Sequence, residues 1–171
     1  MRPVAETPWL SEAAIDVAQR ILNSHRMAFG SPLIAPLPAD ATPTQWAQAL
    51  FAAERVVMAH DGSDPGGDPG PRLIYANRAA LRLWRRAWGE LVGMPSRLTA
   101  EPAARQERAQ ALQQVREQQA IRSYSGIRID SQGRRFQING ARVWTLWRPD
   151  GADHGVEPCG QVAAFGAWHW L

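Results

Sequence analysis

Apolar residues in the first part of the chain return every three or four positions, which is the spacing of helices with one buried face. Residues 11–27 follow this pattern, with Ser11 suited to cap the first turn and Gly30 suited to end the helix. A second helix is predicted to begin at residues 42–45, because their sequence Thr-Pro-Thr-Gln is that of a capping box. The pattern predicts a pair of amphipathic helices within the first 55 residues.

Strand-like patterns replace the helical spacing in the middle of the chain. Short apolar runs at residues 56–59 and 72–76 are typical of strands, and the Gly-, Pro- and Asp-rich segment between them predicts a loop. Asn77 then suits the cap of a helix whose apolar face includes Trp84 and Trp88. This part is therefore predicted to form two strands followed by a helix.

A polar helix and three longer strands complete the predicted order. The helix, over residues 102–119, is expected on the surface because its apolar stripe is thin. The stripe consists of Ala104, Ala111, Leu112 and Val115. Strands are predicted over residues 121–130 and 134–147, joined by a turn with Gly133, and over residues 161–171. The order predicts an α+β fold in which five strands form one antiparallel sheet, with helices inserted between the second and third strands.

Both faces of the predicted sheet are apolar. In the last strand, alternation gives one face Val162, Ala164, Trp168 and Trp170, and the other face Ala163, Phe165 and Ala167. An antiparallel sheet with one face in water alternates apolar and polar residues instead. We therefore expect the second face to be covered, either by the amino-terminal helical pair or by a second subunit.

Polar side chains that face inward suggest a ligand site. Simple alternation in strand 121–130 places Arg122, Tyr124, Gly126, Arg128 and Asp130 opposite Ile121, Ser123, Ser125, Ile127 and Ile129. A buried Arg or Tyr needs a carboxylate partner or a ligand. One interpretation is a pocket for an acidic or aromatic ligand, in which arginine grips a carboxylate through two hydrogen bonds. The candidate residues are Trp84, Arg97, Tyr124, Arg128 and Trp144.

The alternative interpretation is a structural network without a ligand. Arg97 or Arg128 would then pair with Glu101, because a buried guanidinium is satisfied by a carboxylate of the same chain. Trp84 and Trp88 would simply fill the core. The sequence leaves both interpretations open.

Composition and charge narrow the function classes. The chain has 171 residues, the size of one ordinary domain, and 45% of them are hydrophobic, as in globular proteins. All nineteen basic residues are Arg, and they are scattered along a chain whose net charge is only +3. This scatter argues against direct nucleic-acid binding, which normally clusters positive charge. No apolar stretch suits a membrane helix and the first residues lack a signal peptide, so we expect a cytoplasmic protein without a membrane segment.

Recognised motifs for metal binding and catalysis are missing. The histidines, at positions 25, 60, 154 and 169, include no pair with zinc-site spacing, and Asp61, Asp64 and Asp68 lack the spacing of a calcium loop. A single cysteine, Cys159, excludes an internal disulfide. Without a nucleophile or phosphate-loop motif, we expect no enzyme activity and no metal. An enzyme is kept as an alternative, and it would need a cleft with two placed polar groups, such as His60 with Asp61 or Tyr124 with an arginine.

Two runs of sequence carry a resemblance to a known family. Leu-Ile-Tyr-Ala-Asn-Arg-Ala-Ala-Leu at residues 73–81, followed by Trp-Gly-Glu-Leu-Val-Gly at residues 88–93, resembles the core signature of PAS domains. More specifically, the chain resembles the bacterial, stand-alone form of the PAS-like MEKHLA family over nearly its whole length. The other matching segments are residues 21–25, 77–84, 95–102, 124–128, 135–136 and 143–144, and the Trp-rich carboxyl end.

The resemblance implies a PAS-like sheet with flanking helices over residues 56–171, preceded by a helical extension over residues 1–55 that packs on the sheet. PAS domains bind a small molecule between sheet and helices, or pair with partners through the outer sheet face. The resemblance therefore implies a non-catalytic sensory or protein-interaction module. Its partner would be a small-molecule ligand, another protein or a second copy of the chain.

The resemblance leaves the cofactor unknown. A flavin photoreceptor of the LOV type needs a reactive Cys in the helical segment after the second strand, whereas Cys159 is expected in the loop before the last strand. A haem-binding PAS domain usually presents a His from the helical region, and no His occurs between Asp61 and Asp153. The family also forms the carboxyl-terminal region of plant class III homeodomain–leucine-zipper transcription factors, so a transcription co-regulator is a further alternative.

Overall fold

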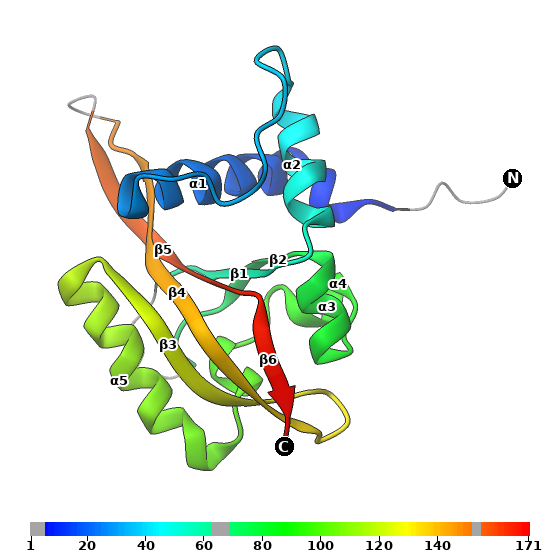
Figure 1. Cartoon of the computed structure of the whole chain (residues 1–171), viewed down its shortest axis with the longest axis vertical. Helices are drawn as coiled ribbons and strands as arrows, with labels where there is room; N and C mark the ends of the chain where they lie inside the picture. The colour runs from blue at the N-terminus through cyan, green and yellow to red at the C-terminus, as the bar shows by residue number, and fades with distance from the viewer. Residues whose placement is uncertain (1–5, 63–68, 152–154) are drawn as a thin grey trace, which may run out of the picture.

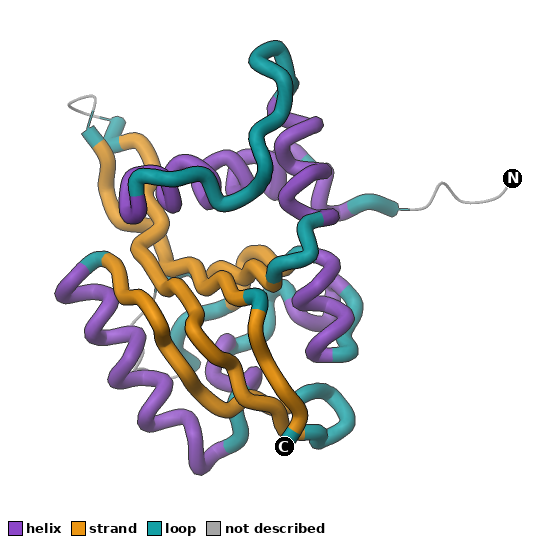
Figure 2. The backbone as a smooth tube through the Cα atoms, viewed as in Figure 1, coloured by secondary structure: helices purple, strands orange, loops and turns teal. Residues whose placement is uncertain are grey.

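The computed structural model of the chain describes residues 6–62, 69–151 and 155–171. Within these residues, six strands form one antiparallel sheet in the order β2-β1-β5-β4-β3, and β6 pairs with β4 beyond the end of β5 (Figures 1 and 2). The strands are β1 (Val56–His60), β2 (Leu73–Ala76), β3 (Ala120–Ile129), β4 (Arg135–Pro149), β5 (Val156–Phe165) and β6 (Ala167–Trp170). The expected antiparallel sheet is confirmed, with its last strand divided in two.

Helices lie on both sides of this sheet. They are η1 (Pro8–Leu10), α1 (Glu12–Phe29), α2 (Pro43–Ala52), α3 (Arg78–Trp84), α4 (Trp88–Leu91), η2 (Ser96–Thr99) and α5 (Pro102–Gln118). Three predicted start signals are confirmed. Ser11 Oγ and Asn77 Oδ1 each accept a hydrogen bond from the backbone N–H three residues on, at 3.2 Å, and Thr42 forms the capping box with Gln45.

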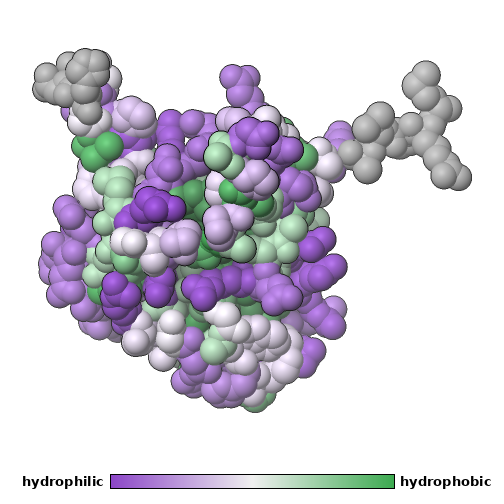
Figure 3. All heavy atoms as spheres, turned by 45° about the horizontal axis from the view of Figure 1, so that its top comes forward, coloured by the Kyte–Doolittle hydropathy of each residue, from purple (hydrophilic) through white to green (hydrophobic). Residues whose placement is uncertain are grey.

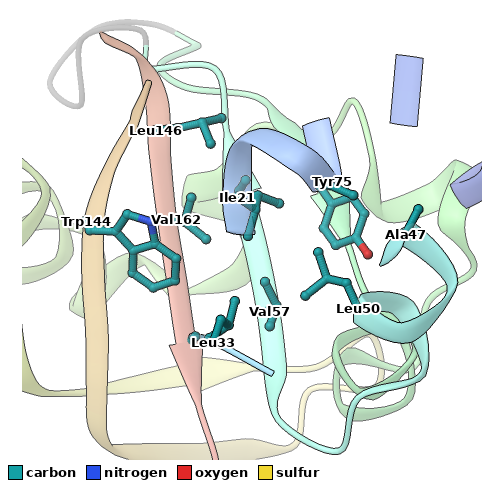
Figure 4. Close-up of a cluster of buried hydrophobic side chains, with 12 residues drawn as sticks. Ile21, Leu33, Ala47, Leu50, Val57, Tyr75, Trp144, Leu146 and Val162 are labelled. Carbon is teal, nitrogen blue, oxygen red and sulfur yellow. The ribbon is translucent and has the colours of Figure 1, made fainter. Parts of the chain in front are cut away.

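The pair of α1 and α2 covers the outer face of the sheet. Ile21 of α1 and Leu50 of α2 are fully buried against Val57, Trp144 and Val162 of the strands (Figure 4). The apolar outer face is therefore buried within the same chain, by the helical pair. Figure 3 looks onto this cover from above and shows hydrophilic and apolar residues intermixed on its surface.

The inner face of the sheet is packed unevenly. Next to α3, Trp84 is buried and its ring meets Phe136 of β4 edge-on, with centroids 5.0 Å apart. Helix α5, which runs beside β3 (Figure 1), is attached by a smaller cluster in which Leu112 and Val115 pack against Val143. The inner layer is thus well filled under α3 and thin under α5.

Asn77 joins three elements through its side-chain amide and is fully buried. Besides capping α3, its Oδ1 accepts a hydrogen bond from the N–H of Val57 at 3.0 Å. Its Nδ2 donates to the carbonyl of Arg55 at 2.7 Å and to that of Leu50 at 3.3 Å. One side chain therefore links the end of α2, the start of β1 and the start of α3.

The helix predicted in the middle of the chain is shorter than expected. It ends at Trp84, because Arg85 adopts a positive φ of 54°. Trp88 begins α4 and its ring lies 5.6 Å from Tyr75 and 6.4 Å from Phe51, in the cluster of the outer face. The expectation that Trp84 and Trp88 share one helix face is wrong, since they pack on opposite sides of the sheet.

The end of the chain also differs from the prediction. The strand begins at Val156 rather than at residue 161, and a bend at Gly166 separates β5 from β6. Val162 faces α1, whereas Trp168 packs against Phe136 in the inner cluster, 6.0 Å between centroids. The predicted common face of these two residues is wrong, because the bend interrupts the strand alternation.

A bulge resets the alternation in β3. Ser123 has a positive φ of 59°, and the register with β4 shifts on both sides of Tyr124. Arg122 consequently lies over the ring of Phe29, 4.7 Å from its centroid, on the side of α1. The expectation that Arg122 shares a face with Tyr124 and Arg128 is wrong, because an extra residue in the strand turns its neighbours to opposite faces.

Candidate ligand site

A cavity of about 70 Å³ lies between the inner face of the sheet and the helices α3, η2 and α5. Its apolar wall is formed mainly by Met58, Leu73, Trp84, Ile138, Val143 and Phe165. Its polar lining residues are His60, Thr99, Arg108, Tyr124, Arg128 and Gln161. The cavity thus combines an apolar body with a group of buried hydrogen-bonding side chains.

The volume of the cavity limits what it can hold in this conformation. An engineered apolar cavity of about 150 Å³ accepts benzene, and pockets for drug-sized ligands measure about 300–1,000 Å³. At about 70 Å³, the closed cavity suits a ligand of only a few heavy atoms. A larger ligand requires the wall to move, and of the two α-helices in the wall, α5 buries fewer apolar side chains than α3.

Tyr124 and Arg128 form one polar corner of the cavity, on β3. Arg128 donates from Nη2 to the Tyr124 hydroxyl at 3.0 Å and from Nη1 to the carbonyl of Ile127 at 2.8 Å. The Tyr124 hydroxyl donates to Oε2 of Glu107 on α5 at 3.2 Å. Burial raises the pKa of Tyr124, although the positive charge of Arg128 opposes this, so the phenol is neutral at physiological pH.

Gly126 makes this corner possible. A Cβ atom at this position would lie 2.6 Å from the Tyr124 hydroxyl oxygen and 2.9 Å from Nη1 of Arg128. Real Cβ atoms do not approach other atoms so closely. The absence of a side chain at residue 126 therefore lets both neighbouring side chains fold over the strand toward the cavity.

Arg108 supplies a second guanidinium from α5. Its exposed fraction is 7%, and Nη2 donates to Ser96 Oγ at 2.7 Å. Burial, reinforced by the charge of Arg128, lowers the pKa of Arg108 to about 9. Among the described residues, neither Arg108 nor Arg128 forms an ion pair with a carboxylate. Two positive charges are therefore buried at one cavity, where the negative charge of Glu107 compensates them only in part.

His60 and Gln161 are cross-strand neighbours on β1 and β5 at the same cavity. His60 Nδ1 accepts a hydrogen bond from the N–H of Gly62 at 3.0 Å, so Nε2 bears the hydrogen of the neutral ring. Gln161 Nε2 donates to the carbonyl of Leu112 at 2.9 Å. His60 Nε2 and Gln161 Oε1 have no partner in hydrogen-bond geometry among the described residues. The nearby Gln161 side chain nevertheless raises the pKa of His60 slightly.

The charge state of His60 follows from its burial. Loss of solvation is the main effect that lowers its pKa, to about 3, and the positive charge of Arg108 adds to it. The negative charge of Asp61 acts in the opposite direction. His60 is therefore a neutral group at physiological pH, able to donate one hydrogen bond from Nε2.

The structure brings together three of the five residues singled out from the sequence. Trp84, Tyr124 and Arg128 line the cavity. Trp144 lies on the opposite face of the sheet, where its ring is 5.0 Å from that of His25. Arg97 is half-buried in η2, outside the cavity lining. The five residues therefore do not form a single site.

The proposed pairing with Glu101 is also different in the structure. Glu101 Oε1 accepts from Nε of Arg135 at 2.9 Å. Arg128 instead bonds to a phenol and a backbone carbonyl. The purely structural network suggested by the sequence is thus not formed at Arg128.

The sequence did not assign four polar residues to the cavity, namely His60, Thr99, Arg108 and Gln161, and it singled out His60 only for the enzyme alternative. A signal existed for Arg108, because it lies four residues after Ala104 and four before Leu112, on the apolar stripe of its helix. A charged residue on such a stripe is a candidate for a buried functional group. His60 and Gln161 meet only through the pairing of β1 with β5, which no local pattern reveals.

Over residues 6–62, 69–151 and 155–171, His, Cys, Asp and Glu side chains form no group of three that could hold a metal ion. Asp64, Asp68 and His154 lie outside the described residues. Cys159 lies within β5, where it packs against the outer cluster, and not in the predicted loop. No described helix has the length and hydropathy needed to cross a bilayer.

Comparison with known proteins identifies a family. Residues 15–170 match the family model described as the MEKHLA domain, which is nearly the whole chain. No curated protein matches the chain. The family match includes both α1 and α2, so the helices over the outer sheet face lie within the matched region.

Solved structures show the same fold. A PAS domain of a protein from Colwellia psychrerythraea aligns with a TM-score of 0.55 and 14% identity, over 74% of this chain and 94% of that one. A fungal LOV domain photoreceptor aligns with a TM-score of 0.53 and 18% identity, over 94% and 95%. An RNA-binding light-oxygen-voltage receptor aligns with a TM-score of 0.58 and 18% identity, over 78% of this chain and 35% of the receptor. At such identities the similarity shows the fold alone.

Proposed function

Because the chain belongs to the MEKHLA domain family and has the fold of PAS domains, we propose that it is a non-catalytic sensory module that holds a small ligand between the sheet and the helices α3 and α5. The similarity to proteins described as light-oxygen-voltage receptors supports a sensory role. In this proposal, residues 1–55 are a helical extension of a PAS-like domain over residues 56–171.

The observation that supports this function best is the pair of buried guanidinium groups at the cavity. A charge removed from water without a partner costs several kcal/mol, so a core that only had to be filled would use apolar residues here. Arg108 and Arg128 both line the cavity and neither is paired with a described carboxylate. A bound molecule would supply the missing interactions.

A non-catalytic role agrees with the chemistry of the lining. General acid–base catalysis works best with a group whose pKa is near the pH of the reaction. The pKa of His60 is lowered to about 3 and that of Tyr124 is raised, so neither group exchanges protons readily near neutral pH. The polar groups of this cavity are better suited to bind a ligand than to transform it.

Helix α5 is the element through which we propose that the ligand acts. It contributes Arg108 and Leu112 to the cavity wall, and it is held to the sheet by few apolar side chains. Occupation of the cavity would therefore change the position or the stability of α5 more than that of the sheet. The outer face already lies under α1 and α2, which makes it the less accessible surface for a partner.

Native mass spectrometry of the purified full chain tests this function. Before the measurement, the protein is incubated with the small-molecule fraction of a cell extract, and its native mass is compared with its denatured mass. We expect the native mass to exceed the mass of the chain reproducibly. This additional mass should be lost on denaturation and should be smaller for Arg128→Gln. The matched control is Arg122→Gln, because Arg122 lies on the same strand but faces α1.

Hydrogen exchange provides a second measurement on the same samples. The surplus mass should be accompanied by slower exchange of the α5 amides and unchanged exchange in β4. A chain that gains no mass from the extract, and whose α5 amides exchange at the same rate with and without it, would contradict the proposed function.

A further inference from the structure

We propose that the ligand of this cavity is a small monocarboxylate, with its carboxylate between Arg108 and Arg128 and its short apolar body against Trp84, Leu73 and Phe165. This inference rests on the proposed function and names the chemical class of the ligand. It follows from the hydrogen-bond capacity, the charge and the size of the site.

The hydrogen-bond capacity of the two arginines points to a planar acceptor. A guanidinium has five N–H donors in a planar fork that matches the two oxygens of a carboxylate. Arg108 uses one donor for Ser96 Oγ, and no other hydrogen bond of this group occurs among the described residues. Arg108 therefore has donors left over beside the cavity, although only 7% of the residue is exposed.

The charge balance favours a single negative charge. Two guanidinium groups are buried at the cavity, and Arg128 is one of the causes that lower the pKa of Arg108. One carboxylate lies at this corner, that of Glu107, which accepts a hydrogen bond from the Tyr124 hydroxyl. One further negative charge would neutralise the pair, whereas a dianion such as phosphate would leave an excess charge in an apolar cavity.

The size and the remaining lining fit a short chain. The volume of about 70 Å³ accommodates a few heavy atoms, and most of the wall beyond the arginines is aliphatic or aromatic. His60 Nε2 and Gln161 Oε1 are two further buried polar atoms without a described partner at the same cavity. Tyr75 Oη and Trp144 Nε1 likewise lack a described partner in the filled outer cluster, so the volume and the apolar wall are the evidence for a short chain.

Calorimetric titration of the full chain with matched probes tests the ligand class. The acids are propionate and hexanoate, the neutral isostere of the first is propionamide, and inorganic phosphate is the competing anion. We expect propionate to bind and propionamide and phosphate to bind at least tenfold more weakly. Hexanoate should bind more weakly than propionate, because its chain exceeds the closed cavity.

Variants locate the binding. Arg108→Gln and Arg128→Gln should each weaken propionate binding by about tenfold to a hundredfold, the loss typical of hydrogen bonds to a charged group. Arg134→Gln is the control, because Arg134 lies over the ring of Trp170, away from the cavity. Should either cavity variant fail to fold, Gly126→Ala provides the same test, since its Cβ displaces the side chains of Tyr124 and Arg128.

The outcomes separate this inference from the proposed function. Equal binding of propionate and propionamide, preferential binding of phosphate, or unchanged binding in both arginine variants would overturn the monocarboxylate assignment. If native mass spectrometry then still showed a bound neutral molecule, the sensory function would stand and the ligand class would be wrong. If neither experiment showed a ligand, both proposals would fail.

Discussion

Replacing Arg108 by Met should stabilise the ligand-free protein. The side chain is 7% exposed and makes one hydrogen bond, to Ser96 Oγ. Burial lowers its pKa from the ordinary value of an arginine to about 9, which corresponds to a destabilisation of the charged form on the order of 5 kcal/mol, at about 1.4 kcal/mol for each tenfold change in the acid dissociation constant. Methionine fills a similar volume without a charge.

The net effect is smaller than this upper value. The substitution removes the hydrogen bond to Ser96, which leaves a buried hydroxyl with one partner fewer and costs about 1–3 kcal/mol. Replacing buried charged groups by apolar residues of similar volume stabilises other proteins by about 1–4 kcal/mol. We therefore expect Arg108→Met to increase the free energy of unfolding by about 1–3 kcal/mol at pH 7.

Urea unfolding in a buffer without carboxylates measures this change, and its pH dependence provides an internal check. The pKa of Arg108 is lower in the folded than in the unfolded chain, so the penalty is fully present below about pH 9 and is lost progressively as the pH rises above about 9. The difference between variant and wild type should thus shrink by about 1 kcal/mol between pH 7 and pH 10. Gln113→Met, at an exposed position of the same helix, should change stability by less than about 0.5 kcal/mol. A less stable Arg108→Met variant would refute the reasoning, because it would mean that the guanidinium is well satisfied in the closed cavity.

Three further predictions concern the buried polar groups. Asn77→Ala should destabilise the protein by about 2–4 kcal/mol in urea unfolding, because it removes a helix cap and leaves the buried N–H of Val57 without an acceptor. A loss of less than about 1 kcal/mol would show that water takes the place of the Asn77 side-chain amide. Gly126→Ala should move the side-chain NMR signals of Tyr124, because the added Cβ would lie 2.6 Å from the hydroxyl oxygen, and an unchanged spectrum would contradict the tight approach. His60 should remain neutral in an NMR titration of the folded protein from pH 5 to pH 8. The unfolded chain binds a proton at His60 that the folded chain excludes, so the contribution of His60 to the free energy of unfolding should be lost as the pH falls from 6.5 toward about 3. His60→Gln should accordingly flatten the pH dependence of unfolding in that range, and an equally steep dependence in the variant would assign the acid sensitivity to other groups.

Local signals in the sequence predict much of the fold, because helix ends and turns depend on residues close together in the chain. Helices α1, α2 and α3 begin directly after the capping residues Ser11, Thr42 and Asn77, as the sequence predicts. Strand alternation does not predict the bulge at Ser123. One residue with a positive φ exchanges the two sheet faces for all strand residues before it. That reversal put Arg122 on the wrong face.

The site was predicted only in part, because it is assembled from distant segments. Tyr124 and Arg128 were found, since both lie on one strand beyond the bulge. Trp144 was assigned to the same pocket, although strand alternation turns it toward α1. His60 and Gln161 are separated by a hundred residues of chain and meet only when β1 pairs with β5.

The weak attachment of α5 has a consequence for how quickly the module can respond. Leu112 and Val115 are its buried apolar residues, and at about 1.5–3 kcal/mol each they oppose detachment by roughly 3–6 kcal/mol. The helix would then be detached in roughly one molecule in a hundred to one in ten thousand at any moment. A ligand that enters beneath α5 waits for such an opening both to arrive and to leave, so association and dissociation are both slow. The fraction of molecules with an occupied cavity would therefore follow the time-averaged concentration of the ligand and would not respond to brief fluctuations.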